Sequence, residues 1–303
     1  MNPTVPAEKQ EVVKAQADFW AHSRRSPIVR TPADYGMEYE EVSFPSYDQV
    51  KLKGWFIPSE GSNKLIICNH PMPMNRYGYP GHLDEFKQLC GFEVNFLPEY
   101  KILHDAGYNL LCYDQRNHGE SGEGDGGVAA AGRHEWKDCV GVKIWADKHP
   151  VFSKMNLGLM SRCMGANAQF EAISRYPELF HNVKCMIAPQ PVTVRYAAEA
   201  FCDQLGILEY IDVLDEEIRK LGGFATTEIG PKPFVPNVHL PTLISQVHED
   251  SWTKPEDVEN IFALLGTREK KLVWIEGTKN RFDGYNFFGE HPKEMLNWYA
   301  KYM

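Results

Sequence analysis

The feature that most constrains this chain is a series of short apolar runs separated by stretches with helical spacing. The runs begin after residue 64 and fall at 65–68, 109–113, 156–160, 183–188, 242–247 and 272–275. The helical stretches fall at 98–106, 133–148, 164–176, 255–265 and 291–302. Strands buried on both faces of a parallel sheet have this nearly continuous apolar character. The pattern therefore predicts an α/β fold with a doubly wound, mostly parallel sheet.

Three segments depart from this alternation. Residues 37–44 and 50–57 alternate polar and apolar side chains around a turn, which predicts an antiparallel hairpin before the parallel strands. Apolar residues at helical spacing within 6–24 predict a helix in an N-terminal extension, residues 1–30. An insertion at 192–236 has helical spacing over 195–221, and we expect it to form a helical cap over the carboxyl edge of the sheet. The whole chain, 1–303, is expected to be one domain.

Composition and charge exclude several classes of protein. The chain has 303 residues, 43% of them hydrophobic, which suits a globular protein with a large core. Its 41 acidic and 32 basic residues give a net charge of −9, which argues against a nucleic-acid or anionic-membrane surface. The apolar runs are shorter than the roughly 18 residues of a membrane span, and the N-terminus lacks the apolar segment of a secretion signal. Seven scattered cysteines without a C-x-x-C pair suit reduced thiols.

These observations predict a cytoplasmic protein whose partner is a small molecule. We expect no nucleic-acid partner, no membrane partner and no cofactor, and the chain could form a homodimer. The neighbours His248, Glu249 and Asp250 have metal-ligand side chains, but adjacent loop residues point in different directions, so no metal is expected. The glycine-rich run 122–127 lacks the lysine of a phosphate-binding loop and is interpreted as a flexible loop.

The most informative segment leads from a predicted strand into a predicted helix through Ser161-Arg162-Cys163-Met164-Gly165. A sharp turn at this place forces strained backbone angles on its central residue, so the positions two residues away must be small, as Ser161 and Gly165 are. The turn would aim the Cys163 sulfur at the helix N-terminus, which favours a thiolate. The alternative is that Cys163 is a buried packing residue.

A second motif agrees with the first. Residues 114–121 read D-x-R-x-H-G-x-S, a turn found after the fourth strand of many α/β-hydrolases. Residues 37–303 therefore resemble the α/β-hydrolase superfamily, and the cysteine at the elbow is similar to that of dienelactone hydrolases in nucleophile type. The resemblance implies Cys163 as nucleophile and Asp250 as the acid, with Glu249 as the neighbouring alternative. It also implies an oxyanion hole made by the backbone N–H groups of Met164 and Met72.

The third catalytic position departs from the family. A histidine is expected shortly after the last strand, but Asn280 stands there, and an asparagine cannot accept a proton near neutral pH. A cysteine nucleophile suffers less from this loss than a serine, because part of a free thiol is already ionised at pH 7. His248, beside Asp250, is the first candidate for a replacement base, and His291 is the second.

The remaining candidates concern substrate binding. His70, Arg76, Trp252 and Asn280 are expected near the site, and the aromatic and methionine content of the surrounding loops indicates an apolar substrate. The sequence thus predicts an acyl hydrolase that uses a cysteine on a small ester, thioester or lactone. The alternatives are an acyltransferase, a non-hydrolytic lyase, isomerase or cyclase on the same fold, and a ligand-binding protein that has lost catalysis.

Overall fold

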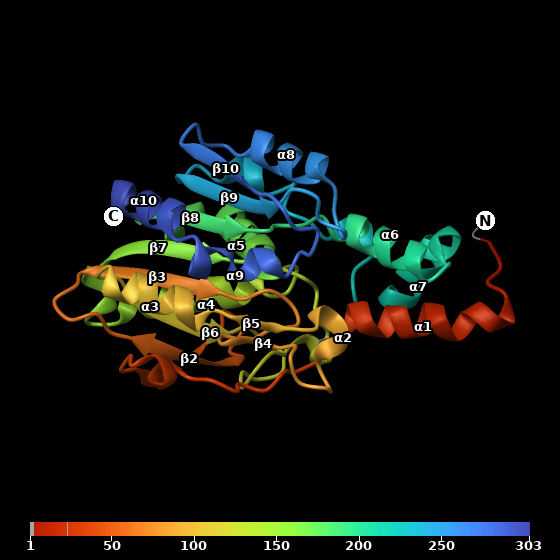
Figure 1. Ribbon diagram of the computed structural model, residues 1–303, viewed down its shortest axis with the longest axis horizontal. Coiled ribbons are helices and arrows are strands. Elements are labelled where there is room, and N and C mark those ends of the chain that lie inside the picture. The colour runs from red at the N-terminus through yellow and green to blue at the C-terminus, as the bar shows by residue number, and fades with distance from the viewer. Residues whose placement is uncertain (1–2, 23) are drawn as a thin grey trace.

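The core of the molecule is an eight-stranded sheet in the order β1-β2-β6-β3-β7-β8-β9-β10 (Figure 1). The computed structural model describes residues 3–22 and 24–303. β1 pairs with β2 and β2 with β6 in antiparallel fashion, and all other neighbours are parallel. The strands of this sheet are β1 (Glu40–Pro45), β2 (Lys51–Ile57), β3 (Lys64–Asn69), β6 (Asn109–Asp114), β7 (Asn156–Ser161), β8 (Val183–Pro189), β9 (Thr242–Val247) and β10 (Lys270–Ile275).

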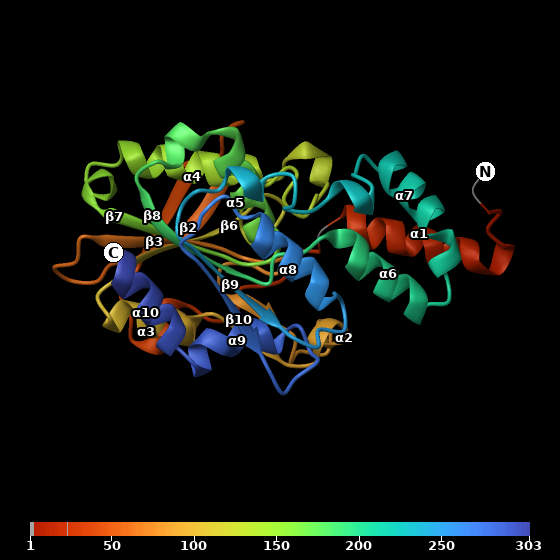
Figure 2. The ribbon, with the colours of Figure 1, turned by 90° about the horizontal axis from the view of Figure 1, so that it is seen from above.

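Helices cover both faces of the sheet (Figure 2). One face packs against α4 (Trp136–Lys148), α5 (Met164–Arg175) and α8 (Pro255–Leu264). The other face packs against α3 (Leu97–Asp105), α9 (Asp283–Glu290) and α10 (Lys293–Tyr302). β3, β6 and β7 carry almost wholly buried side chains, as strands between two helical layers should.

Three helices form a separate group beside this body. α1 (Ala7–Ala21), α6 (Val194–Gln204) and α7 (Ile211–Lys220) pack together around Val13, Ala17 and Leu214, and we call them the helical layer. Figure 1 shows the layer projecting from one end of the sheet, with α1 in red although it comes from the start of the chain. The segment 195–221, predicted to be helical, is thus two helices separated by a turn at Gly206, which has φ of +65°.

The α/β architecture with antiparallel strands at its start is confirmed. The structure also contains elements that the sequence did not predict. They are α9 and an antiparallel pair of short strands, β4 (Gly78–Pro80) and β5 (Glu93–Asn95), with α2 (Lys87–Cys90) in the segment that connects them. Within the described residues, no helix is both long and apolar enough to span a bilayer. The same residues contain no group of three or more histidine, cysteine, aspartate or glutamate side chains placed to hold a metal ion.

Candidate active site

Cys163 occupies a strained turn between β7 and α5. Its φ is 50° and its ψ is −110°, a combination that side-chain-bearing residues rarely adopt. The Cys163 N–H donates to the carbonyl of Pro189 at 2.9 Å, which fixes the turn. A Cβ atom on Gly165 would lie 2.7 Å from the Cβ of Asn69, so this position has no room for a larger residue. The backbone therefore has the geometry expected of a nucleophile elbow.

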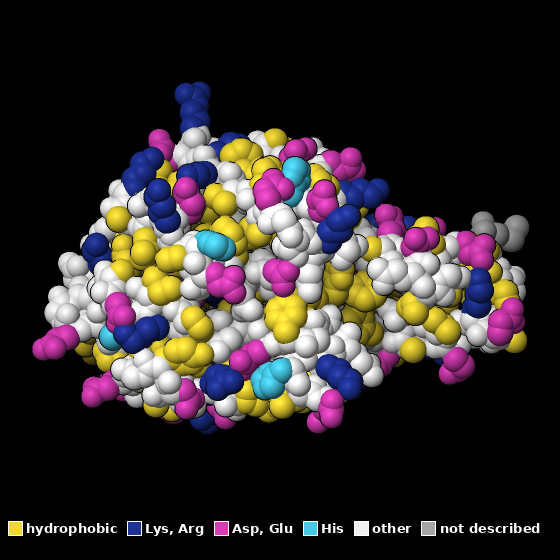
Figure 3. Space-filling view, viewed as in Figure 1, with side chains coloured by type: hydrophobic (Ala, Val, Ile, Leu, Met, Phe, Trp, Pro, Cys, Tyr) yellow, Lys and Arg dark blue, Asp and Glu magenta, His cyan; other side chains and the backbone are white. Residues whose placement is uncertain are grey.

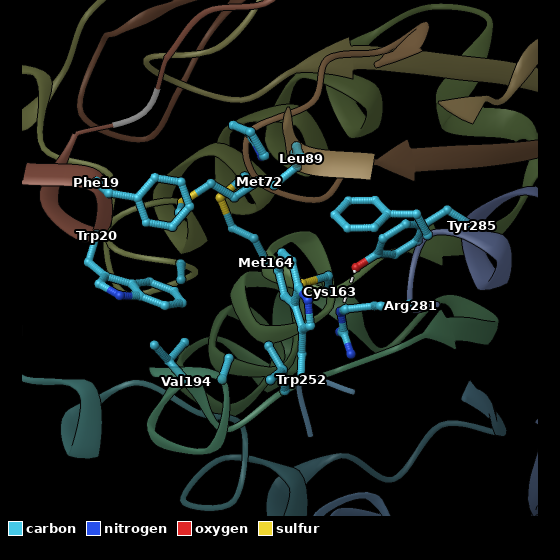
Figure 4. A pocket seen from close by; sticks show the side chains of 15 residues that line it. Phe19, Trp20, Met72, Leu89, Cys163, Met164, Val194, Trp252, Arg281 and Tyr285 are labelled. Atoms are coloured by element: carbon cyan, nitrogen blue, oxygen red, sulfur yellow. Dashed lines mark hydrogen bonds between the residues drawn. The ribbon is translucent and has the colours of Figure 1, made fainter. Parts of the chain in front are cut away.

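A pocket opens above the thiol (Figure 4). It encloses about 560 Å³, its open mouth included, and its wall is largely apolar. The helical layer contributes Phe19 and Trp20 from α1 together with Val194 and Ala197 from α6. The other lining residues are Met72, Pro73, Leu89, Ala131, Cys163, Met164, Val192, Trp252, Arg281, Phe282 and Tyr285. Among the described residues that line it, none is a histidine.

Arg281 takes the position beside the acid that the family gives to histidine. Its Nη1 donates to Asp250 Oδ2 at 2.6 Å, its Nη2 donates to the carbonyl of Gln190 at 2.5 Å, and its Nε donates to the Tyr285 hydroxyl at 3.0 Å. Burial alone would lower the pKa of Arg281, but Tyr285, Asp250 and Cys163 outweigh it and hold that pKa well above its ordinary value. Arg281 is therefore a permanent cation that reaches the thiol and cannot serve as a base.

Tyr285 completes the polar side of the pocket. Burial raises the pKa of its phenol well above the ordinary value, so the group keeps its proton at neutral pH. Because the Tyr285 oxygen accepts the Arg281 N–H, its own hydrogen is free to be donated, and Cys163 lies within hydrogen-bonding reach of it. Figure 4 shows Tyr285 and Arg281 side by side next to Cys163. Two donors, one charged and one neutral, thus face the sulfur.

Asp250 is buried, and four hydrogen bonds hold its carboxylate, three of them on Oδ2. Besides Arg281, its carboxylate accepts from Gln246 Nε2 at 2.7 Å, from Thr253 Oγ1 at 3.0 Å and from the Trp252 N–H at 2.9 Å. Gln190 returns a hydrogen bond from its Nε2 to the Arg281 carbonyl at 2.7 Å. These contacts fix the ion pair in one geometry, and the candidate acid lies in the place predicted for it.

The two predicted oxyanion-hole residues both line the pocket. Met164 is the first residue of α5 and Met72 lies in the loop after β3. Within the described part of the chain, neither backbone N–H donates to a protein acceptor. Both N–H groups are therefore without an acceptor among the described residues at the pocket that holds Cys163.

The histidines proposed from the sequence are not at this site. His248 follows β9, but its ring stacks on Trp274 at 4.6 Å and its Nδ1 pairs with Glu276 at 2.9 Å on the surface. His291 is exposed at the junction of α9 and α10. The expectation that His248 faces the thiol is therefore corrected, because Trp274 of β10 and Glu276, just after it, hold the imidazole away from the pocket.

Three predicted substrate-binding residues also have other positions. His70 is buried, its Nδ1 bonds the Pro71 carbonyl and its Nε2 accepts the Gln115 N–H at 2.9 Å, so it braces the loop that carries Met72. Arg76 is buried against Asp114 at 2.6 Å and Glu120 at 2.5 Å. Asn280 accepts the Phe282 N–H at 3.0 Å and shapes the turn before α9. None of them lines the pocket.

Trp252, the fourth predicted contact, does line the pocket. Its ring meets Phe201 of α6 at 4.6 Å and Phe282 at 5.2 Å, both edge to face, and so joins the helical layer to the body. Arg281 and Tyr285 were not predicted. No local pattern marked them, because Arg281 stands one residue after the place expected for histidine and its burial depends on Asp250, 31 positions away.

We compared the chain with known protein families, sequences and structures. No family model matches the chain. The sequence is 23% identical over 235 residues to the uncharacterized protein YqkD from Bacillus subtilis. The matched region covers 75% of this chain and 68% of that protein. An esterase from Pyrococcus furiosus superposes with a TM-score of 0.71 at 19% identity, over 94% of this chain and 98% of that one. The chain has the α/β-hydrolase fold.

Two further α/β-hydrolase structures superpose over 88% of this chain and 99% of their own. They are the hydrolase GrgF from a Penicillium species, with a TM-score of 0.63 at 17% identity, and a dienelactone hydrolase from Anabaena variabilis, with a TM-score of 0.54 at 16% identity. At these identities the α/β-hydrolase fold is what the proteins share, and the chemistry has to be argued from the site.

Proposed function

We propose that this protein catalyses acyl chemistry, in which Cys163 takes up the acyl group of a small, largely apolar ester, thioester or lactone. The observation that carries the proposal is the position of the Cys163 thiol, on a strained elbow in an apolar pocket, beside Arg281 and Tyr285. Arg281 supplies a fixed positive charge that stabilises a thiolate, and burial makes that charge more effective than it would be in water.

Acylation needs few groups. The Cys163 thiolate attacks the substrate carbonyl, and the resulting oxyanion accepts the N–H groups of Met72 and Met164. When the tetrahedral intermediate collapses, the bond to the leaving group breaks. A thiolate or another weakly basic leaving group departs without a proton, whereas an alkoxide has to take one, for which Tyr285 is the neighbouring donor. The site therefore favours thioesters and activated esters over simple alkyl esters.

The second half of the reaction distinguishes hydrolysis from transfer. Water must lose a proton as it attacks the S-acyl cysteine, but Arg281 and Tyr285 are protonated, and the Asp250 carboxylate is buried in its ion pair with Arg281 and does not line the pocket. An acceptor thiol ionises by itself to a useful extent near neutral pH, and its attack releases the Cys163 thiolate without a base. We therefore favour acyl transfer to a thiol, with hydrolysis as a slow side reaction.

One observation favours a second candidate, a non-hydrolytic reaction such as isomerisation or carbon–carbon bond cleavage. Arg281 and Tyr285 together present a charged and a neutral donor inside an apolar pocket, which would stabilise an enolate as well as a thiolate. In that reaction Cys163 would form no bond to the substrate.

The test is to mix the protein with a hexanoyl thioester and to follow its intact mass and thiol release. We expect one acyl group on Cys163, rapid loss of that group to added thiols and slow loss to water. Cys163→Ser should abolish the adduct, and Cys90→Ser, which changes a half-buried cysteine outside the pocket, should preserve it. If the wild-type protein forms no adduct, or if Cys163→Ser keeps its turnover, the covalent mechanism is wrong and the second candidate gains.

A further inference from the structure

The pocket above Cys163 continues into a second, wider hollow. The two share Phe19, Met72, Pro73 and Leu89, so they adjoin along the oxyanion-hole loop and the end of α1. The second hollow encloses about 1300 Å³, its open side included, and we call it the outer chamber. Figure 3 shows hydrophobic side chains gathered where the helical layer meets the body of the molecule. The outer chamber is further lined by Ala15, Gln16, His22, Arg24, Arg25, Tyr79, Glu85, Phe86, Gln88 and Phe201.

The charge of the outer chamber is opposite to that of the whole protein. Arg24 and Arg25 line it against a single lining carboxylate, Glu85, although the chain carries a net charge of −9. His22 pairs with Asp18 at 2.8 Å and adds little. The guanidinium of Arg25 is fixed by two backbone carbonyls, those of His118 at 3.0 Å and Gly119 at 2.8 Å.

Neither arginine has a carboxylate partner within the parts of the chain that the structure describes. Arg25 bonds only carbonyl oxygens, which leave its positive charge uncompensated. Arg24 is exposed and forms no ion pair with a described residue, and it lies close enough to the Tyr79 hydroxyl to act on it electrostatically. Two uncompensated cations beside a concave surface raise the local concentration of anions.

Two polar atoms on α1 are buried and lack a partner among the described residues. Trp20 Nε1 belongs to the wall of the inner pocket, and Gln16 Oε1 belongs to the outer chamber. A buried donor or acceptor without a partner costs free energy, so both atoms are suited to a ligand that brings polar groups. Trp20 and Gln16 stand one turn apart on α1, the helix that borders both hollows.

We propose that the substrate has two parts: an apolar acyl group in the inner pocket and an anionic leaving group, carrying a carboxylate or a phosphate, in the outer chamber against Arg24 and Arg25. This inference rests on the proposed acyl chemistry and specifies its substrate class. The acyl carbon lies at Cys163, the linker passes Phe19 and Met72, which line both hollows, and the charge lies at the open end. Thiol leaving groups that bear an acid match this arrangement.

The first measurement is independent of the chemistry. Unreactive S-hexyl thioethers of 2-mercaptoethanol, 3-mercaptopropionate and 2-mercaptoethyl phosphate are titrated by calorimetry. We expect at least one of the two anionic ligands to bind about threefold to tenfold more tightly than the neutral one, with the difference shrinking at high salt. The tighter of the two anionic ligands identifies carboxylate or phosphate as the favoured group.

Variants then locate the effect. Arg24→Gln should reduce the preference for anionic ligands, Arg24→Glu should reverse it, and Arg24→Lys should restore most of it. The matched control is Arg268→Gln, because Arg268 is exposed just before β10, at the opposite edge of the sheet, and forms no ion pair with a described residue. It changes the net charge equally and should leave the preference as in the wild-type protein.

The results separate the two proposals. Equal binding of neutral and anionic ligands, or an equal effect of Arg268→Gln and Arg24→Gln, overturns the inference about the outer chamber whether or not Cys163 is acylated. A preference for anions that Arg24 controls supports it, even if hexanoyl thioesters leave no adduct on Cys163. Intact mass with the hexanoyl thioesters of the same three thiols tests the acyl chemistry separately.

Discussion

The guanidinium of Arg281 lies between the buried Asp250 carboxylate and the Cys163 thiol. Its neighbours hold its pKa well above the ordinary value, so it keeps its positive charge. It neutralises Asp250, which would otherwise be an unpaired buried charge, and it presents a cation to Cys163. A histidine there could alternate between its two protonation states, and arginine cannot. In the proposed mechanism, Arg281 therefore supplies charge beside Cys163 but cannot act as a base.

Restoring a base at this position should restore hydrolysis. In Arg281→His, the imidazole would stand next to Asp250 and within reach of Cys163, so we expect water to cleave the S-acyl enzyme roughly 10²-fold faster, the low end of general-base contributions. The measurement is the rate at which acyl-Cys163 disappears, by intact mass, without added thiol.

Asn280→His is the matched control for that experiment. Asn280 shapes the turn before α9 and does not line the pocket, so a histidine there should leave the hydrolysis rate within about twofold of the wild type. Faster hydrolysis in Asn280→His than in Arg281→His would mean that the residues on this loop are placed differently from the arrangement described.

The sequence predicts the strained turn at Cys163 better than its surroundings. The turn could be recognised because Ser161, Gly165 and a strand-to-helix change are local signals. Arg281 could not, because an arginine is usually a surface residue, and its burial depends on Asp250, which is 31 positions away. A difference of one residue in the loop after β10 decides which side chain reaches the acid, and local patterns do not fix loop conformation that closely.

At the scale of elements, the turn after β6 is held by one arginine. Arg116 binds Asp48 at 2.6 Å, Asp125 at 2.5 Å and Asp138 at 2.8 Å. Burial acts to raise the pKa of Asp48, but hydrogen bonds from Arg116, Ser46 and Lys137 outweigh it and hold that pKa well below the usual range. An acid whose pKa is lower in the folded state stabilises the fold above its unfolded pKa of about 4 and loses that effect as the pH falls.

Asp48→Asn should therefore lower the free energy of unfolding at pH 7 by about 0.5–1 kcal/mol, a modest value because the carboxylate is partly exposed and screened. The loss should shrink as the pH falls below about 4, because the unfolded chain then binds a proton that the folded Asp48 carboxylate resists. Urea unfolding at several pH values measures it. Asp84→Asn, at an exposed pair with Lys87, is the control and should have little effect at any pH. A loss of equal size at pH 3 and pH 7 would contradict the role given to Asp48.

The first helix is an element whose location the sequence did not predict. It was expected as an N-terminal extension, but α1 packs on α7 and α6 and gives Phe19 and Trp20 to the pocket. Its position depends on residues two hundred positions away, which apolar spacing alone cannot specify. The spacing did identify the face that is buried, including Val13 and Ala17.

Displacing α1 should open the pocket. Ala17 is buried against the helical layer, so Ala17→Gln overpacks that contact and should cost about 1–3 kcal/mol of local stability. We expect Cys163 to react several-fold faster with a bulky maleimide, while the far-ultraviolet circular dichroism stays unchanged. Ala7→Gln, at an exposed position on the same helix and outside both hollows, should leave the rate near that of the wild type. Similar rates in both variants would show that α1 does not restrict access.

At the scale of the whole molecule, the α/β alternation made the fold predictable and the packing of distant segments did not. Most strands begin and end within two residues of the predicted apolar runs, because a sheet covered on both faces needs continuous apolar strands. The pocket, by contrast, is assembled from α1, the loops after β3, β7, β8, β9 and β10, and α6. Residues 19 and 285 meet there only because the completed sheet brings its loops to one edge.

A ligand on Cys163 should therefore stabilise segments far apart in the sequence. Alkylation with N-hexyl iodoacetamide places an apolar chain against Trp20, Val194 and Phe282, each from a different segment. Hydrogen exchange should slow in α1, in α6 and at residues 281–288, because opening any of them now exposes the buried chain to water. Exchange in β3 and β7, already buried in the sheet, should not change. Protection confined to α5 would mean that the alkyl chain points to solvent and that α1 and α6 do not enclose the substrate.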